Sequence, residues 1–137
     1  MWRTFLRAHA RAIRELEREL LAEAGMPLGW YDVLLQLAEA PERRLRMAEL
    51  AERVLLSRSG LTRLIDRLQA ERLVRREPSP DDARGTFTVL TAGGFARLRA
   101  AAPIHLAGIR KHWLTRFSDE ELRTIGALLD RVGDGGD

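Results

Sequence analysis

The sequence predicts a mainly α-helical protein that carries one small β-hairpin. Three observations support this fold class. Apolar residues recur at helical spacing over most of the chain, one short stretch combines β-prone residues with a turn, and proline or glycine separates the segments. A length of 137 residues suits one domain, and 45% hydrophobic with 31% charged residues provides enough apolar surface for a folded core.

The first two helices are separated by a break that contains glycine and proline. Residues 2–24 place apolar side chains at steps of three and four on one face and charged side chains on the other, which is the pattern of an amphipathic helix. Gly25 and Pro27 end this helix. A strongly apolar segment from Trp30 to near Pro41 then predicts a helix of the core.

Two short helices in tight succession are predicted next, over residues 47–55 and from Ser57 to about Arg72. The buried stripe of the second helix is expected at Leu61, Leu64, Ile65 and Leu68. The segment 57–76 holds six arginines and two acidic residues, so its net charge of +4 exceeds the +3 of the whole chain. Positive charge is therefore concentrated around the second of these helices, as expected for a surface that meets a polyanion.

The stretch VRREPSPDDARGTFTVLT, residues 74–91, predicts the β-hairpin. Its β-prone residues flank a turn region of prolines, acidic residues and a glycine. A long helix is expected over residues 92–117. Pro103 lies inside it and should kink the helix or shift its start.

The last helix has a clear start signal. Ser118 and Glu121 have the spacing of a capping box, ahead of apolar residues at helical intervals. The tail, residues 133–137, is glycine-rich and acidic and has no apolar anchor, so we expect it to fray.

Several classes of protein are disfavoured by what the sequence lacks. The chain has no cysteine, which excludes disulfides, thiolate metal sites and a cysteine redox switch. No apolar run could span a bilayer and the start is unlike a signal peptide, so we expect no membrane partner and a cytoplasmic location. Neither a glycine-rich phosphate loop nor a nucleophile elbow occurs, so neither an enzyme nor a cofactor is expected. His9, His105 and His112 lack close metal-ligand spacing, and we expect no metal site.

Residues 45–76 have the layout of a helix-turn-helix, in which the second helix lies in the major groove of double-stranded DNA. Arginine can pair with guanine edges through two parallel hydrogen bonds, and hydroxyl and amide groups at a helix start can hold phosphates. The candidate DNA-contacting residues of this helix are Ser57, Arg58, Ser59, Thr62, Arg63 and Arg67.

The order of these segments resembles the MarR (multiple antibiotic resistance regulator) family of winged helix-turn-helix regulators over nearly the whole chain. The strongest match is the hairpin, which is similar to the family signature D-x-R-x-x-x-x-x-L-T. The matching positions of this signature are Asp82, Arg84, Leu90 and Thr91. The segments ELA at 49–51 and LTRLIDRL at 61–68, which lie outside the hairpin, also match the family. The resemblance implies that Arg84 lies at the wing tip and enters the minor groove, where negative potential is concentrated, and that Asp82 helps to hold it.

Three positions depart from the family pattern. Arg46 stands where a capping Thr or Ser is usual, so the third helix is expected to start less firmly. Arg72 stands where glycine is usual, so it has to adopt a left-handed backbone conformation at some cost. Pro103 lies inside the helix that should lead to the dimer interface.

The resemblance implies a homodimeric, ligand-responsive repressor that binds a pseudo-palindromic operator. Residues 30–91 would form the winged DNA-binding lobe, and residues 1–24 and 92–132 would form dimerisation helices. A small aromatic or amphipathic ligand would bind between these parts. Its candidate contacts are His9, Trp30 and Tyr31. The alternative is a winged-helix adaptor that binds other proteins and not DNA, which the small overall charge would suit.

Overall fold

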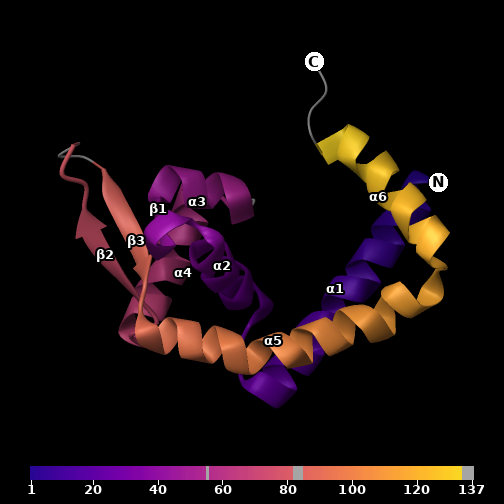
Figure 1. The fold of residues 1–137 in the computed structure, drawn as a ribbon, viewed down its shortest axis with the longest axis horizontal. Helices are drawn as coiled ribbons and strands as arrows, with labels where there is room; N and C mark the ends of the chain where they lie inside the picture. The colour runs from indigo at the N-terminus through magenta and orange to yellow at the C-terminus, as the bar shows by residue number, and fades with distance from the viewer. Residues whose placement is uncertain (55, 82–84, 134–137) are drawn as a thin grey trace.

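The computed structural model describes residues 1–54, 56–81 and 85–133, and it shows a mainly helical chain with one small sheet, as predicted (Figure 1). The helices are α1 (Trp2–Ala24), α2 (Leu28–Glu39), α3 (Met47–Val54), α4 (Arg58–Ala70), α5 (Ala92–His112) and α6 (Asp119–Gly133), with 3-10 turns η1 (Pro41–Arg43) and η2 (Leu114–Arg116). The strands are β1 (Arg44–Arg46), β2 (Val74–Pro78) and β3 (Thr86–Leu90). Among the described residues, no helix combines the length and the hydropathy that crossing a bilayer requires.

The chain is divided in space between a winged lobe, which we define as residues 28–90, and an arm formed by α1, α5 and α6 (Figure 1). α5 starts directly after β3, runs away from the lobe and packs against α1. The N-terminus and α6 lie at the end of the arm that is far from the wing. The lobe and the distal end of the arm are therefore connected through α1 and α5.

The sheet has the strand order β1-β3-β2, and both strand pairs are antiparallel. β2 and β3 form the predicted hairpin, in register from Val74 opposite Leu90 to Pro78 opposite Thr86. The sequence does not predict β1, because three residues are too few to show a period-two pattern. Arg46 stands at the position where a capping Thr or Ser is usual. It is the last residue of β1 and lies opposite Phe87. α3 therefore starts directly from a hydrogen-bonded strand.

A continuous apolar core joins the winged lobe to α1 and α5. Its largest fully buried residues include Leu20, Met26, Val33, Leu34, Leu37, Leu50, Leu61, Ile65, Leu68 and Val74. Full burial of one such side chain contributes about 1.5–3 kcal/mol. Three members of the predicted stripe of α4 belong to this core, and Leu64 packs against it. The core therefore determines which face of α4 is turned to solvent.

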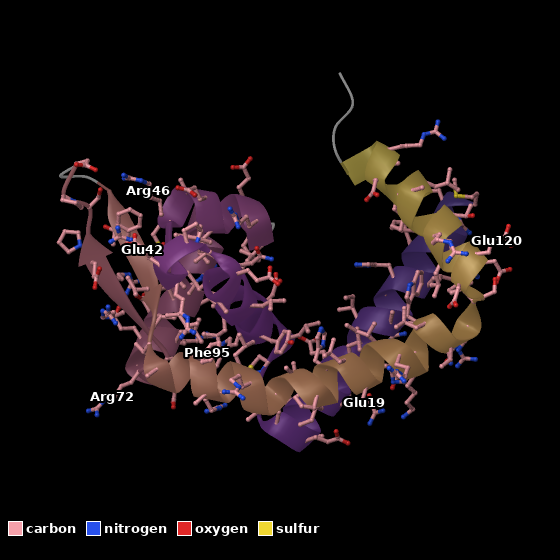
Figure 2. All side chains as sticks on the ribbon, in the orientation of Figure 1. Glu19, Glu42, Arg46, Arg72, Phe95 and Glu120 are labelled. Carbon is pink, nitrogen blue, oxygen red and sulfur yellow. The ribbon has the colours of Figure 1, made fainter. Side chains whose placement is uncertain are left out.

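The turn between α4 and β2 contains the left-handed residue that the sequence predicts. Arg72 has a φ of 59° and lies near the start of α5 (Figure 2). The hydroxyl of Thr91 donates a hydrogen bond of 2.7 Å to the carbonyl oxygen of Arg72 and accepts one of 3.0 Å from the backbone N–H of Gly94. Thr91 is therefore the N-cap of α5, and it also holds the left-handed turn in place.

The structure confirms the sequence prediction for α5 and α6 in part. The Thr91 cap fixes the start of α5 at Ala92, so Pro103 does not shift it, and the helix continues through Pro103. The predicted end at residue 117 is wrong, because Trp113 leaves the helical conformation at φ −125° and ψ −65°. The capping box of α6 is confirmed: the backbone N–H of Glu121 donates to Oγ of Ser118, and the backbone N–H of Ser118 donates to the Glu121 carboxylate.

Candidate nucleic-acid interface

The N-terminus of α4 is held by a side-chain cap. The backbone N–H of Gly60 donates to Oγ of Ser57 at 3.2 Å, and the hydroxyls of Ser57 and Ser59 lie 3.3 Å apart. A cap of this kind satisfies one of the free N–H groups at a helix start. Ser57, a predicted DNA contact, therefore also has a structural role in starting α4.

One face of α4 presents polar side chains to solvent. Ser59, Arg63 and Arg67 are four residues apart, so they share this face, and all three are exposed. We call these three residues the exposed face of α4. Thr62 is exposed as well, and the side chain of Arg58 lies outside the described part of the structure. Among the described residues, no hydrogen bond or ion pair engages Arg63 or Arg67, so both guanidinium groups are available to a ligand.

The wing is joined to α4 by Arg76 of β2. Its guanidinium donates to Oδ1 of Asp66 at 2.6 Å and to Oε1 of Gln69 at 2.6 Å, and more weakly to the backbone oxygen of Thr62 at 3.4 Å. Arg76 contributes to the basic segment that the sequence analysis singles out, yet its charge is paired within the protein. The composition of the segment could not show that Arg76 braces the wing, because its partners lie on a different element.

Other arginines of the wing are engaged within it. The guanidinium carbons of Arg44 and Arg46 on β1 lie 4.5 and 4.8 Å from the ring centroid of Phe87 on β3, within the range of cation–π contacts. Arg75 pairs with Glu77 on the same strand at 2.9 Å. Figure 2 shows Arg46 at the winged end of the molecule. These contacts stiffen the base of the wing. Those of β1 could not be predicted from the sequence, because the strand itself is not predicted.

The two candidate residues of the wing signature, Asp82 and Arg84, lie outside the described residues. The described strands form the stem of the hairpin as far as Pro78 opposite Thr86. One further backbone hydrogen bond, 2.9 Å from the N–H of Ser79 to the oxygen of Gly85, continues this stem.

Known proteins combine this winged lobe with the same helical arm. The sequence model of the MarR family matches residues 24–85. A MarR family transcriptional regulator from Streptomyces coelicolor, Sco3205, whose crystal structure is a complex with DNA, is 39% identical with a TM-score of 0.93, over 98% of this chain and 84% of that chain. The chain belongs to the MarR family.

Two further relatives agree with this membership. AbsC, another MarR family transcriptional regulator from Streptomyces coelicolor, is 34% identical with a TM-score of 0.91, over 97% of this chain and 89% of that chain. The HTH-type transcriptional repressor YetL from Bacillus subtilis is 28% identical over 127 residues, which is 90% of this chain and 75% of that protein. As a MarR-family member the chain is a DNA-binding transcriptional regulator and not an enzyme, which favours the DNA-binding prediction over the adaptor alternative.

The ligand candidates of this MarR-family chain do not form one cluster within a single chain. Tyr31 is buried, and its ring centroid lies 4.4 Å from that of His105 on α5. Trp30 is half-buried against the core. His9 is exposed and stacks on Phe5 near the start of α1. Among the described residues, no ring contact joins His9 to Trp30 or Tyr31.

Two further titratable side chains, Asp32 and His105, lie close to Tyr31 where α2 meets α5. The sequence did not predict either of them as part of a ligand site. Burial raises the pKa values of Tyr31 and Asp32 and lowers the pKa of His105. The Nδ1 atom of His105 is buried and has no hydrogen-bond partner in the described part of the chain. The junction between the winged lobe and the arm therefore combines aromatic surface with a buried polar atom that no described residue satisfies.

Proposed function

We propose that this MarR-family protein is a homodimeric repressor that binds a pseudo-palindromic operator through α4 and the wing. The observation that carries the proposal is the exposed face of α4. Its Arg63 and Arg67 have no partner among the described residues, whereas Arg76 beside them is committed to bracing the wing. Free arginines on a helix held rigidly against its neighbours suit a recognition helix in the major groove.

The residues of α4 divide between reading bases and positioning the helix. Arg63 pairs with a guanine edge through two parallel hydrogen bonds, because it lies in the middle of the exposed face. The residues near the helix start, together with Arg67, hold phosphates or reach neighbouring base edges. These supporting residues are Ser57, Arg58, Ser59, Thr62 and Arg67.

The wing adds a contact to the neighbouring minor groove. Arg84 enters this groove and Asp82 orients it, as the family signature implies. A narrow minor groove attracts arginine through its concentrated negative potential. The hydrogen bonds of Arg76 to α4 support this assignment, since they keep the base of the wing at a constant distance from the recognition helix.

Residues 30–91 serve as the DNA-binding lobe, and residues 1–24 and 92–132 serve as dimerisation helices. The support comes from apolar side chains that one chain leaves uncovered: Trp2 is 67% exposed, Leu128 51% and Val132 79%. None of the described residues of α6 is buried. A second copy that covers these surfaces would place two α4 helices about one turn of DNA apart, and binding would repress transcription by occlusion.

A small aromatic or amphipathic ligand binds where the lobe meets the arm and changes the separation of the two lobes. Trp30 and Tyr31 are its proposed contacts. The Nδ1 atom of His105 beside Tyr31 supports this, since it is buried and has no hydrogen-bond partner among the described residues. His9 takes part only if the second copy supplies it, since it shares no described ring contact with the other two in one chain. A ligand acts in this way only if it prefers one separation of the lobes.

Titration of the full-length protein against DNA tests the repressor. One duplex spans the promoter region of the protein's own gene, and a scrambled duplex of equal length serves as the control. We expect preferential binding to the promoter duplex with two chains per site, and an affinity that falls by about 10³-fold or more between about 50 and 200 mM salt. Equal binding of both duplexes at the lower salt concentration would contradict the proposal.

A further inference from the structure

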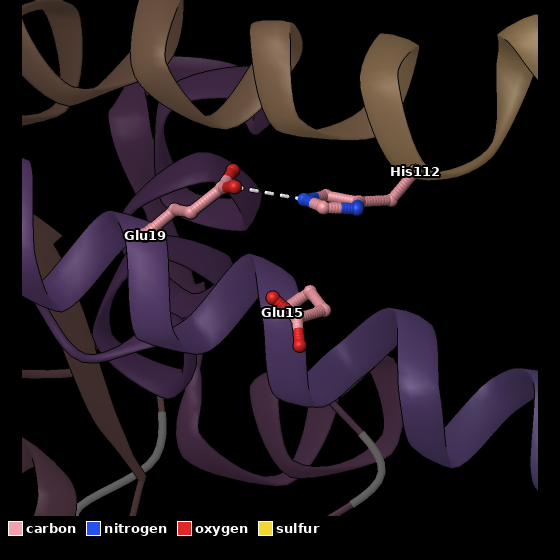
Figure 3. A group of neighbouring side chains, drawn as sticks. All are labelled: Glu15, Glu19 and His112. Atoms are coloured by element: carbon pink, nitrogen blue, oxygen red, sulfur yellow. Dashed lines mark hydrogen bonds and ion pairs between the residues drawn. The ribbon is translucent and has the colours of Figure 1, made fainter.

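Three side chains with metal-binding atoms meet in the arm, outside the proposed DNA interface. Glu15 and Glu19 lie one turn apart on α1, so they share a face, and His112 comes from the end of α5 (Figure 3). One ligand atom from each residue lies within 4.8 Å of the other two. The Nε2 atom of His112 lies 2.8 Å from Oε1 of Glu19. Two carboxylates and an imidazole from two different helices thus converge on one point.

The packing of α1 against α5 brings this cluster together. Gly108 is buried on α5 where α1 crosses it, and a Cβ atom there would lie 2.9 Å from Leu16 and 3.2 Å from Oε2 of Glu19. A Cβ atom there would force the side chain of Leu16 and the carboxylate of Glu19 to shift. The side chains of Glu19 and His112 are only 15% and 16% exposed. The cluster is therefore a partly buried, close-packed site.

The charges of the cluster are balanced by two long basic side chains. Arg18 pairs with Glu15 at 2.8 Å, and Lys111 pairs with Glu19 at 3.0 Å. The side chains of Arg18 and Lys111 are 63% and 68% exposed. Ion pairs with side chains this exposed contribute little to stability. Both basic groups can therefore turn into solvent at small cost and leave the two carboxylates free for another cation.

We propose that Glu15, Glu19 and His112 form a binding site for a first-row transition-metal dication of the Zn²⁺ class. Imidazole nitrogen with carboxylate oxygen suits such metals, whereas Mg²⁺ and Ca²⁺ prefer oxygen alone. Zinc bonds of 2.0–2.2 Å place tetrahedral ligand atoms about 3.3 Å apart. Small side-chain rotations would bring the three atoms to that separation.

The rest of the coordination shell is accessible from solvent. An open cavity of about 470 Å³ adjoins the cluster and is lined by both Glu15 and His112. Water from this cavity can occupy the position that three protein ligands leave open. On binding, the proton on Nε2 of His112 passes to solvent, Nδ1 carries the ring proton, and the neutral imidazole offers its Nε2 lone pair to the metal. The bound metal joins α1 to α5 directly in the proposed dimerisation arm.

From the sequence we expect no metal at the histidines, whereas the structure places His112 beside two carboxylates. His112 has no metal-ligand spacing to another residue in the sequence, since its carboxylate partner Glu19 lies 93 positions away. The proposal is independent of the DNA-binding proposal, because the cluster shares no residue with the exposed face of α4.

Competition between the full-length, untagged protein and a chromophoric zinc chelator tests the site. We expect saturable binding of one Zn²⁺ per chain that a large excess of Mg²⁺ does not displace. Glu15→Gln and His112→Gln should each weaken Zn²⁺ binding by about tenfold or more. His9→Gln is the matched control, since it removes an exposed histidine outside the cluster, and it should bind Zn²⁺ like the wild type.

Thermal unfolding with and without Zn²⁺ gives a second measurement. Zn²⁺ should raise the Tm of the wild type and of His9→Gln, and it should raise the Tm of Glu15→Gln or His112→Gln much less. Glu15 is the most exposed of the three ligands, so Glu15→Gln keeps the comparison valid if His112→Gln folds poorly. Absence of saturable binding would show that the cluster is an ion-pair network only. Equal affinity of the wild type, Glu15→Gln and His112→Gln would place any bound zinc elsewhere.

Discussion

Arg76 on β2 and Asp66 on α4 form an ion pair of 2.6 Å that joins the wing to the proposed recognition helix. A second hydrogen bond of 2.6 Å, from the same guanidinium to Gln69, holds the side chain in a fixed orientation. The arginine side chain is 28% exposed, and the aspartate side chain is 61% exposed. The pair therefore contributes more to the relative position of two elements than to the free energy of unfolding.

Arg76→Ala should weaken operator binding while leaving the fold largely intact. Loss of the brace lets the wing move relative to α4, so we expect a loss of about 1 kcal/mol in binding, roughly fivefold in Kd. The free energy of unfolding should fall by less than about 1 kcal/mol. Arg75→Ala is the control, because within the described part of the chain Arg75 pairs only with Glu77 on its own strand. If both substitutions weakened operator binding equally in fluorescence anisotropy, the loss of one positive charge would explain the effect, and the brace would not contribute.

Arg63→Ala should relax the sequence preference of the protein. If Arg63 pairs with a base edge, its removal costs about 1–3 kcal/mol per half-site and erases the preference at one symmetric operator position. Affinity for non-specific DNA should change less. The measurement is a binding series over operators with single-base substitutions. A specificity profile identical to that of the wild type would leave Arg63 as a solvated surface charge.

Arg84→Ala should weaken binding to many sequences and reduce the preference for A·T tracts. A minor-groove arginine responds to groove width and electrostatic potential more than to base identity. The dependence of affinity on salt concentration should become shallower, because one cation fewer contacts the backbone. Titrations at several salt concentrations measure this slope. Unchanged affinity would remove Arg84 from the proposed interface.

Gly94→Ala should destabilise the protein. A Cβ atom at this position would collide with the backbone carbonyl of Leu73 and lie 2.7 Å from Leu90, and a backbone group cannot move aside at small cost. We expect a loss of about 1–3 kcal/mol in chemical denaturation. Gly93→Ala is the matched control, since the nearest atom to its Cβ lies 3.6 Å away. Two variants of equal stability would show that α5 can shift away from β2.

Leu129→Glu should convert the proposed dimer into a monomer. Leu129 is 45% exposed on α6 in the single chain, and a carboxylate there would lie in the interface without a partner. Light scattering should report a monomeric mass, and operator affinity should fall because one lobe then binds alone. Leu129→Met conserves volume and polarity and should remain dimeric. A dimeric Leu129→Glu protein would place the interface elsewhere.

The sequence by itself determined the local elements of this protein. The apolar period predicted α1 over residues 2–24 as observed, and the capping box at Ser118 predicted the start of α6. The resemblance to a family that usually has glycine at position 72 predicted the left-handed conformation of Arg72, which the structure shows. The exposed face of α4 followed from residue spacing opposite an apolar stripe. All of these features depend on interactions within a few residues, which periodicity and capping rules describe.

Tertiary structure alone decided which charged groups are free and which are paired. Asp66 and Arg76 lie ten positions apart on different elements, and Glu19 and His112 lie 93 positions apart. β1 forms only because β3 supplies its hydrogen-bonding partner. These contacts arise after the core has fixed α4 against the wing and α1 against α5. The energy of an ion pair or a ligand cluster depends on distance and burial in space, and the order of residues along the chain does not encode these quantities directly.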